Sequence, residues 1–356
     1  MADKLTTSLM KTVLASSGMQ AQLLAALMEM LASIWGGFED WYEPDGVQRA
    51  AKLAAEAEAA ALTQVRRAAS STARELLRQT GETITVDPLE ALEHPRGVDP
   101  LELWERPAEA YRYAISQGKN DTEALAAAMN RAGHIAKADV AITARDAQIR
   151  EFRRSEKVKG YRRVIHPELS KSGVCGLCIV AADRLYSLKE LMPLHDGCNC
   201  TVAPVTARND PGLKLNQQDL EELYSAAGGS TRREDLARLR ITSYEHGELG
   251  PTLVRVGQSY LSPEEAAARK RPPKRHLRAV KSNSDTALRK KKNRNTAETQ
   301  RLLDTSQKKL DAYQKAIDEA KAAGKSPDDI TIRGYVYGLQ RERKNVLSYT
   351  KELKAA

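Results

Sequence analysis

All four cysteines of this 356-residue chain lie in one short window, and a histidine lies among them. Their order is Cys175, Cys178, His195, Cys198 and Cys200. Two residues between the first two cysteines let both sulfur atoms reach one ion from a tight turn, and the second close set can complete a tetrahedral shell. Zinc needs four ligands and five are offered, so either the histidine with three cysteines or the four cysteines alone would close it. The spacing predicts a structural Zn²⁺ site.

Disulfides, a redox pair and ordinary unbound thiols are the alternatives, although unbound thiols would not be expected to gather in one window. Two disulfides could form with three connectivities, and a redox pair could form at Cys175 and Cys178. Disulfides are rare in a reducing cytoplasm, and a redox pair needs no second cluster at metal-ligand spacing. Structural zinc can supply on the order of 10 kcal/mol of folding free energy. We therefore expect a metal ion that stabilises the fold of a small module. A catalytic zinc is not expected, because such a site keeps an open coordination position.

The composition favours long solvated helices over a sandwich or barrel, because aromatic residues make up only 5% of the chain and charged residues 29%. Apolar residues recur at helical spacing in residues 1–35, and residues 47–79 form a long alanine-rich stretch. The apolar run at 23–35 is interrupted by Glu29 and is shorter than the roughly 20 residues that a bilayer requires. We expect a mainly α fold with an elongated helical region at 1–119 and no membrane contact.

A compact α+β module is expected at residues 120–261. Asn120, Asp121 and Thr122 can cap a long helix that ends before the module's first strand. Short β segments are predicted at 161–168 and 200–205, on either side of the cysteine window. A short helix is predicted to open at Asn216.

A small β hairpin is predicted at residues 241–256 of the same module. Arg162, Arg163 and His166 precede the cysteine window. We interpret them as surface charges or as supports for a nearby metal ligand, and not as catalytic residues. The other histidines are isolated in sequence.

The positive charge is concentrated in one segment. The chain carries a net charge of +9, and residues 269–294 hold twelve Lys or Arg and one acid, Asp285, so this segment contributes +11 and the remainder −2. Paired prolines and few apolar residues predict a largely disordered basic arm at 262–295. Such an arm can bind double-stranded DNA without sequence preference, although a solvated linker or a ligand for an acidic protein has the same composition. The predicted DNA-contacting residues are Arg269, Lys270, Arg271, Lys274, Arg275, Arg278, Lys281, Arg289, Lys290, Lys291, Lys292 and Arg294.

Residues 296–356 are predicted to form an antiparallel helical hairpin that contacts a partner. Leu303, Leu310 and Ile317 recur every seven residues, as on a coiled-coil face. After a turn at Gly324, a second helix is predicted to be capped by Ser326.

The segment 160–205 resembles the signature of the MuF-like minor capsid proteins of tailed bacteriophages, the group typified by the phage Mu F minor head protein. The resemblance rests on the paired CxxC and HxxCxC motifs with the preceding "RRVIHPELS", and it covers roughly residues 121–256. It implies a virion protein of the phage head interior or portal vertex, made in the bacterial host cytoplasm. Its expected partners are the portal protein and/or the major capsid protein, with packaged DNA as a further contact. The five residues of the window match the family's metal cluster.

Two other functional classes stay open. A zinc-containing DNA-binding protein outside the virion would have the same cluster and arm. A metal-dependent nuclease or hydrolase would need an open coordination site and a positioned base, for which the sequence offers little. Some MuF-like relatives are fused to a protease or toxin domain, but this sequence has no recognisable nucleophile elbow. We therefore expect a structural protein and not an enzyme.

Overall fold

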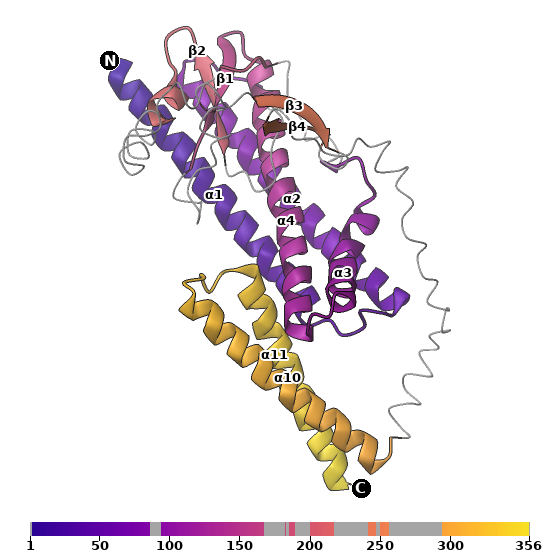
Figure 1. The fold of residues 1–356 in the computed structure, drawn as a ribbon. Helices are drawn as coiled ribbons and strands as arrows, with labels where there is room; N and C mark the ends of the chain where they lie inside the picture. The colour runs from indigo at the N-terminus through magenta and orange to yellow at the C-terminus, as the bar shows by residue number, and fades with distance from the viewer. Residues whose placement is uncertain are drawn as a thin grey trace. The chain divides into compact units, whose positions relative to one another are not determined.

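The chain is mainly α-helical, as predicted (Figure 1). The computed structural model describes residues 2–85, 94–166, 182, 185–188, 200–216, 241–246, 250–255 and 294–355. None of the helices in these ranges combines the length and the apolar character needed to cross a membrane. The six long helices are α1 (Ala2–Gly36), α2 (Pro44–Gln79), α3 (Pro100–Ser116), α4 (Asp121–Arg153), α10 (Thr296–Ala322) and α11 (Ile330–Ala355).

The chain divides into two compact units. Unit 1 contains Met1–Leu24, Ala59–Gly97 and Lys137–Arg269. Unit 2 contains Ala25–Glu58, Val98–Ala136 and Lys270–Ala356. The division therefore passes through three continuous helices, α1, α2 and α4, each of which gives one half to each unit.

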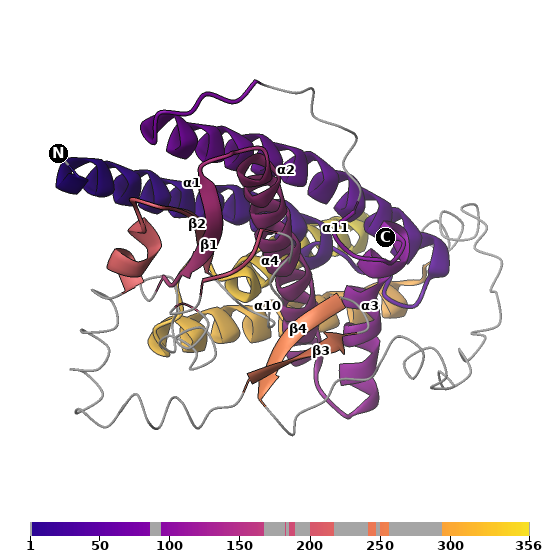
Figure 2. The same ribbon diagram turned by 90° about the horizontal axis from the view of Figure 1, so that it is seen from above.

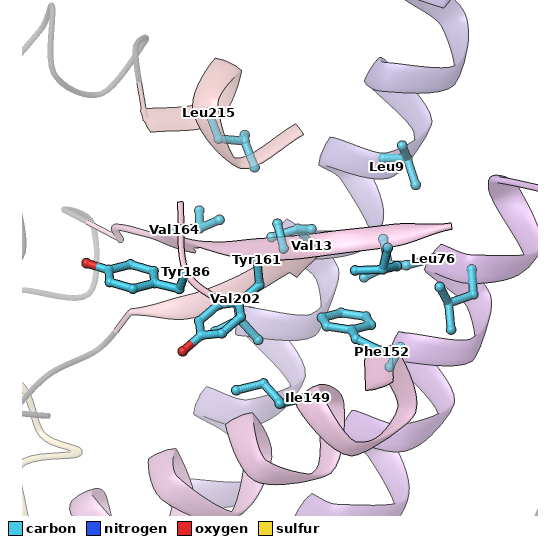
Figure 3. Packing of buried hydrophobic residues seen from close by; sticks show 14 residues of the cluster. Leu9, Val13, Leu76, Ile149, Phe152, Tyr161, Val164, Tyr186, Val202 and Leu215 are labelled. Atoms are coloured by element: carbon cyan, nitrogen blue, oxygen red, sulfur yellow. The ribbon is translucent and has the colours of Figure 1, made fainter. Parts of the chain in front are cut away.

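The core of unit 1 forms where three helices meet a small sheet. Strand β1 (Val158–Val164) pairs antiparallel with β2 (Thr201–Thr206), which confirms the β segments predicted beside the cysteine window. Figure 3 shows side chains of α1, α2 and α4 meeting those of the two strands. The cluster includes Leu9, Val13, Leu76, Leu77, Ile149, Phe152, Tyr161, Val164, Val202 and Leu215.

A second antiparallel pair in unit 1 consists of β3 (Ile241–His246) and β4 (Gly250–Arg255), labelled in Figure 2. Its register pairs Ile241 with Arg255 and His246 with Gly250. The predicted β hairpin is thus confirmed.

The start of α4 is set by the predicted cap. The Asn120 side chain accepts a hydrogen bond from the backbone N–H of Glu123 at 2.9 Å, and the Glu123 carboxylate accepts one from the backbone N–H of Asn120 at 3.1 Å. This reciprocal pair satisfies two donors that a helix start leaves without intrahelical partners.

Helices α10 and α11 form the hairpin predicted at the C-terminal end of the chain (Figure 1). The predicted cap of its second helix is wrong. Ser326 Oγ accepts from the backbone N–H of Asp328 in the connecting turn, whereas Asp329 Oδ1 accepts from the N–H of Thr331. The helix therefore begins at Ile330, because Asp329 offers its carboxylate where the helical bonding starts.

Within unit 2, the hairpin packs on the protein's own helices through glycines. A Cβ added to Gly36 of α1 would lie 2.7 Å from the carbonyl oxygen of Gly334 in α11. A Cβ added to Gly334 would lie 2.5 Å from the Met129 side chain of α4, and one added to Gly133 would lie 3.1 Å from Ile330. The absence of side chains at these glycines lets the helix backbones approach closely.

Charged side chains stabilise the same contacts between the hairpin and the other helices of unit 2. Arg341 donates to the carbonyl oxygen of Phe38 at 2.6 Å and to that of Gly36 at 3.3 Å, at the C-terminal end of α1. Lys309 Nζ lies 2.8 Å from Asp121 Oδ2. Burial raises the pKa of Asp121, but hydrogen bonds from Lys309 and Tyr111 outweigh it, so the pKa of this carboxyl is lowered. The hairpin is thus docked by ion pairs and backbone contacts as well as by small residues.

We predict that Gly36→Ala destabilises the protein by about 1–3 kcal/mol, the usual cost of overpacking, because the new methyl group meets backbone atoms that cannot turn away. The free energy of unfolding in urea measures this change. Gly18→Ala in the same helix is the matched control, since a Cβ there meets nothing within 4 Å. The control is expected to be neutral or stabilising. Equal effects of both substitutions would contradict the close-packing argument.

Candidate functional site

One of the five predicted metal ligands lies in the described part of the chain. Cys200 immediately precedes β2, and only 2% of its surface is exposed. Cys175, Cys178, His195 and Cys198 lie outside the described residues. Of the predicted DNA-contacting residues, Arg294 alone is described. The structure therefore describes the framework on both sides of the cysteine window.

Strand β1 pairs along one edge with the strand that follows the window and along the other edge with a residue inside it. On one edge it pairs with β2, where Val164 lies opposite Thr201. On the other edge Tyr161 and Tyr186 exchange two backbone hydrogen bonds of 3.0 and 2.9 Å. Tyr161 lies opposite Pro204 of β2, and because its N–H and C=O both bond Tyr186, this is a non-hydrogen-bonded pair, a position that a proline without an N–H can occupy. A residue between Cys178 and His195 is thus fixed to the same strand that precedes the window.

Asn216 ties three segments together from a buried position. It is 1% exposed, and its Nδ2 donates to the carbonyl oxygens of Arg163 at 2.7 Å and Ala182 at 3.0 Å. Its Oδ1 accepts from the backbone N–H of Ile165 at 3.1 Å. Buried backbone groups need such partners, so one amide satisfies three of them. The segments joined are the end of β1, a residue inside the window and the helix at 211–216.

The prediction that Asn216 opens a helix is therefore wrong. Residues 211–216 are already helical, and the backbone N–H of Leu213 donates to Asp210 Oδ1 at 2.9 Å. Asp210 thus provides the cap. Asparagine is favoured at helix starts because its side chain bonds nearby backbone, but here that capacity serves a long-range contact.

Helix α4 holds the C-terminal end of the window. Arg145 donates from Nε and Nη2 to the carbonyl oxygen of Cys200 at 2.8 and 2.5 Å, and both residues are buried. One residue further, Thr201 Oγ1 lies 2.8 Å from Nε2 of His166. His166, the last described residue before the window, and Thr201, directly after it, are therefore side by side.

Two of the three residues interpreted as possible surface charges are buried instead. Arg163 is 1% exposed and His166 is 3% exposed, because β1 is covered on both faces. Arg162 pairs with Asp210, with 2.5 Å between Nε and Oδ2. The alternative interpretation, that they support a metal ligand, stays a prediction for Arg163 and His166. The surface interpretation is wrong for these two.

A second group could hold a metal ion and gave no signal in the sequence. Glu58 of α2, His94 and Asp139 of α4 each offer one ligand atom, and these atoms lie within 4.8 Å of one another. Trp104 Nε1 donates to Glu58 Oε2 at 2.7 Å, and Arg96 Nε lies 2.6 Å from Asp139 Oδ1. Such neighbours orient carboxylates. Oxygen and nitrogen donors suit several divalent cations, so the donor set does not select zinc.

The chain shows no match to a protein-family model, to a curated protein or to a solved structure.

We predict that Asn216→Ala lowers the free energy of unfolding by about 2–4 kcal/mol, because three buried backbone groups lose their partner at about 1–3 kcal/mol each before relaxation. Chemical denaturation followed by circular dichroism measures this loss. Arg208→Ala, at an exposed turn of the same module, is the control and is expected to stay within about 0.5 kcal/mol of wild type. An unchanged midpoint for Asn216→Ala would show that Asn216 does not hold the window.

Proposed function

We propose that this chain is a MuF-like structural minor head protein of a tailed phage, placed at or near the portal vertex. The observation that carries the proposal is the motif pair itself, CxxC and HxxCxC, with "RRVIHPELS" directly before it. The framework of buried polar contacts around β1 supports a structural role for this window. No nucleophile elbow is recognisable in the sequence, and no catalytic activity is proposed.

The proposed metal is one structural zinc ion. Cys200 would contribute from the end held by Arg145, together with three of Cys175, Cys178, His195 and Cys198. Sulfur and imidazole donors at this spacing are the ligand types that tetrahedral zinc prefers. A bound zinc would supply folding free energy to the module. The protein's own part is to hold the segments that flank the window through Asn216, His166 and Arg145.

The proposed partners are the portal protein and/or the major capsid protein, and packaged double-stranded DNA. The basic arm supplies the charge for DNA, because lysine and arginine that neutralise phosphates release condensed counterions. Such binding is sequence-blind, as a protein that contacts a whole packaged genome would require.

We predict about one zinc ion per chain in protein purified under reducing conditions, measured by elemental analysis. Cys198→Ser is expected to lose or weaken the metal and to lower the temperature of unfolding. His276→Asn, which removes a histidine outside the window, is the control and should keep full metal content. A metal-free wild type with four titratable thiols and an intact fold would contradict the zinc proposal.

We predict that the chain copurifies with the cognate portal protein on co-expression and is detected by mass spectrometry in purified virions. DNA binding without portal binding and without virion incorporation would favour a DNA-binding protein outside the virion. Nicking of plasmid DNA in the presence of magnesium or zinc would favour a nuclease. Either result would contradict the proposal of a structural head protein.

A further inference from the structure

Among the residues that the structure describes, one exposed face of α11 carries positive charge without compensating acids. At 3.6 residues per turn, six exposed residues between positions 340 and 354 fall within an arc of about 100°. Four of the six are cationic, and the other two are a glutamine and a leucine. They are Gln340, Arg343, Lys344, Leu347, Lys351 and Lys354. We call this set the α11 basic face.

The two acids of α11 point elsewhere. Glu342 is buried and accepts from Arg341 Nη2 at 2.7 Å. Glu352 Oε2 lies 3.7 Å from Nη1 of Arg294. Both carboxylates are thus engaged by arginines outside the α11 basic face. The four cations of that face are left to solvent or to an external partner.

The neighbouring helix of the hairpin has a different pattern. On α10, the exposed cations Arg301, Lys308 and Lys315 alternate with the acids Asp304, Asp311 and Asp318. Each row repeats every seven residues, so the two rows run beside each other along the helix. Lys315 also lies 3.8 Å from Glu319. A mixed surface of this kind attracts a polyanion weakly. Of the two hairpin helices, α11 is therefore the one whose exposed cations are concentrated on one face.

The basic arm ends against the same helix. Arg294, its last cation, places its guanidinium 5.4 Å from the ring centroid of Tyr349 and next to Glu352. Lys290, Lys291 and Lys292 directly precede it in the sequence. Tyr349 and Glu352 lie about 170° and 130° around α11 from the centre of the α11 basic face, so Arg294 leaves that face uncovered.

We infer that the α11 basic face binds the phosphate backbone of double-stranded DNA. From residue 343 to residue 354 a helix rises about 16 Å, and duplex DNA carries one negative charge per about 1.7 Å of axis. Cations along one straight face can therefore contact several phosphates of one duplex. The face has no aromatic residue for base stacking, so it recognises DNA by charge and without sequence preference. This inference rests on the proposed DNA contact and names a folded part of it.

The test measures the affinity of the full chain for a short duplex as a function of salt concentration. Variant one replaces Arg343, Lys344, Lys351 and Lys354 with Gln. Each phosphate contact contributes about 0.9 to the slope of log K against log salt, so the slope should fall by about 2–4. Affinity near physiological salt should fall on the order of tenfold or more. All four side chains are exposed, and circular dichroism checks that the fold is kept.

Two further variants separate the possible results. The control replaces Arg301, Lys308, Lys315 and Lys321 of α10 with Gln, which removes the same charge from the same hairpin and should leave the slope nearly unchanged. The third variant replaces Lys290, Lys291 and Lys292 with Gln in the arm. An unchanged slope in variant one, with a reduced slope in the arm variant, would overturn the inference and leave the arm as the DNA contact.

The remaining outcomes also test whether the α11 basic face binds DNA. Equal losses in variant one and in the α10 control would overturn the inference, because net charge and not the face would govern binding. A wild-type chain without salt-dependent DNA affinity would remove the proposed DNA contact itself. An acidic protein that binds wild type but not variant one, while DNA binding stays intact, would assign the face and the 72% exposed Leu347 to a protein partner.

Discussion

Close packing of helices through alanine and glycine is the constraint on which this structure depends. In α4 the buried alanines Ala124, Ala128, Ala132 and Ala136 recur every four residues and form one stripe along the helix. Each small side chain buries little apolar area, so stability has to come from long helices and from near approach of their backbones. The same constraint explains Gly36 and Gly334, where any side chain would separate two helices. A core of this kind tolerates added volume poorly.

Polar contacts supply what the thin core does not. The segments around the cysteine window are joined by buried amide, guanidinium and imidazole groups, and these groups satisfy backbone atoms that would otherwise be costly to bury. Directional bonds fix positions more narrowly than apolar contacts do. The proposed zinc would add a further restraint to this module.

The proposed role as a head protein needs a rigid part and a part that adapts to DNA. The hairpin would be the rigid part, since one side of α11 packs on helices of unit 2 and another side carries exposed cations. The arm would follow the path of the DNA, while the α11 basic face would offer a fixed point of attachment. Electrostatic binding of this type is reversible and independent of sequence.

The sequence by itself determined the local elements. Helical periodicity and alanine content predicted the long helices, and the candidate caps at residues 120–122 predicted the start of α4. Apolar segments beside the cysteine window predicted β1 and β2. These signals act between residues close in the chain. Only the tertiary structure decided where polar side chains find distant partners. Asn216 and Ser326 have the chemistry of helix caps, yet a remote backbone engages one and a turn the other. The group of Glu58, His94 and Asp139 has no sequence spacing that could reveal it, since three separate segments meet there only after folding.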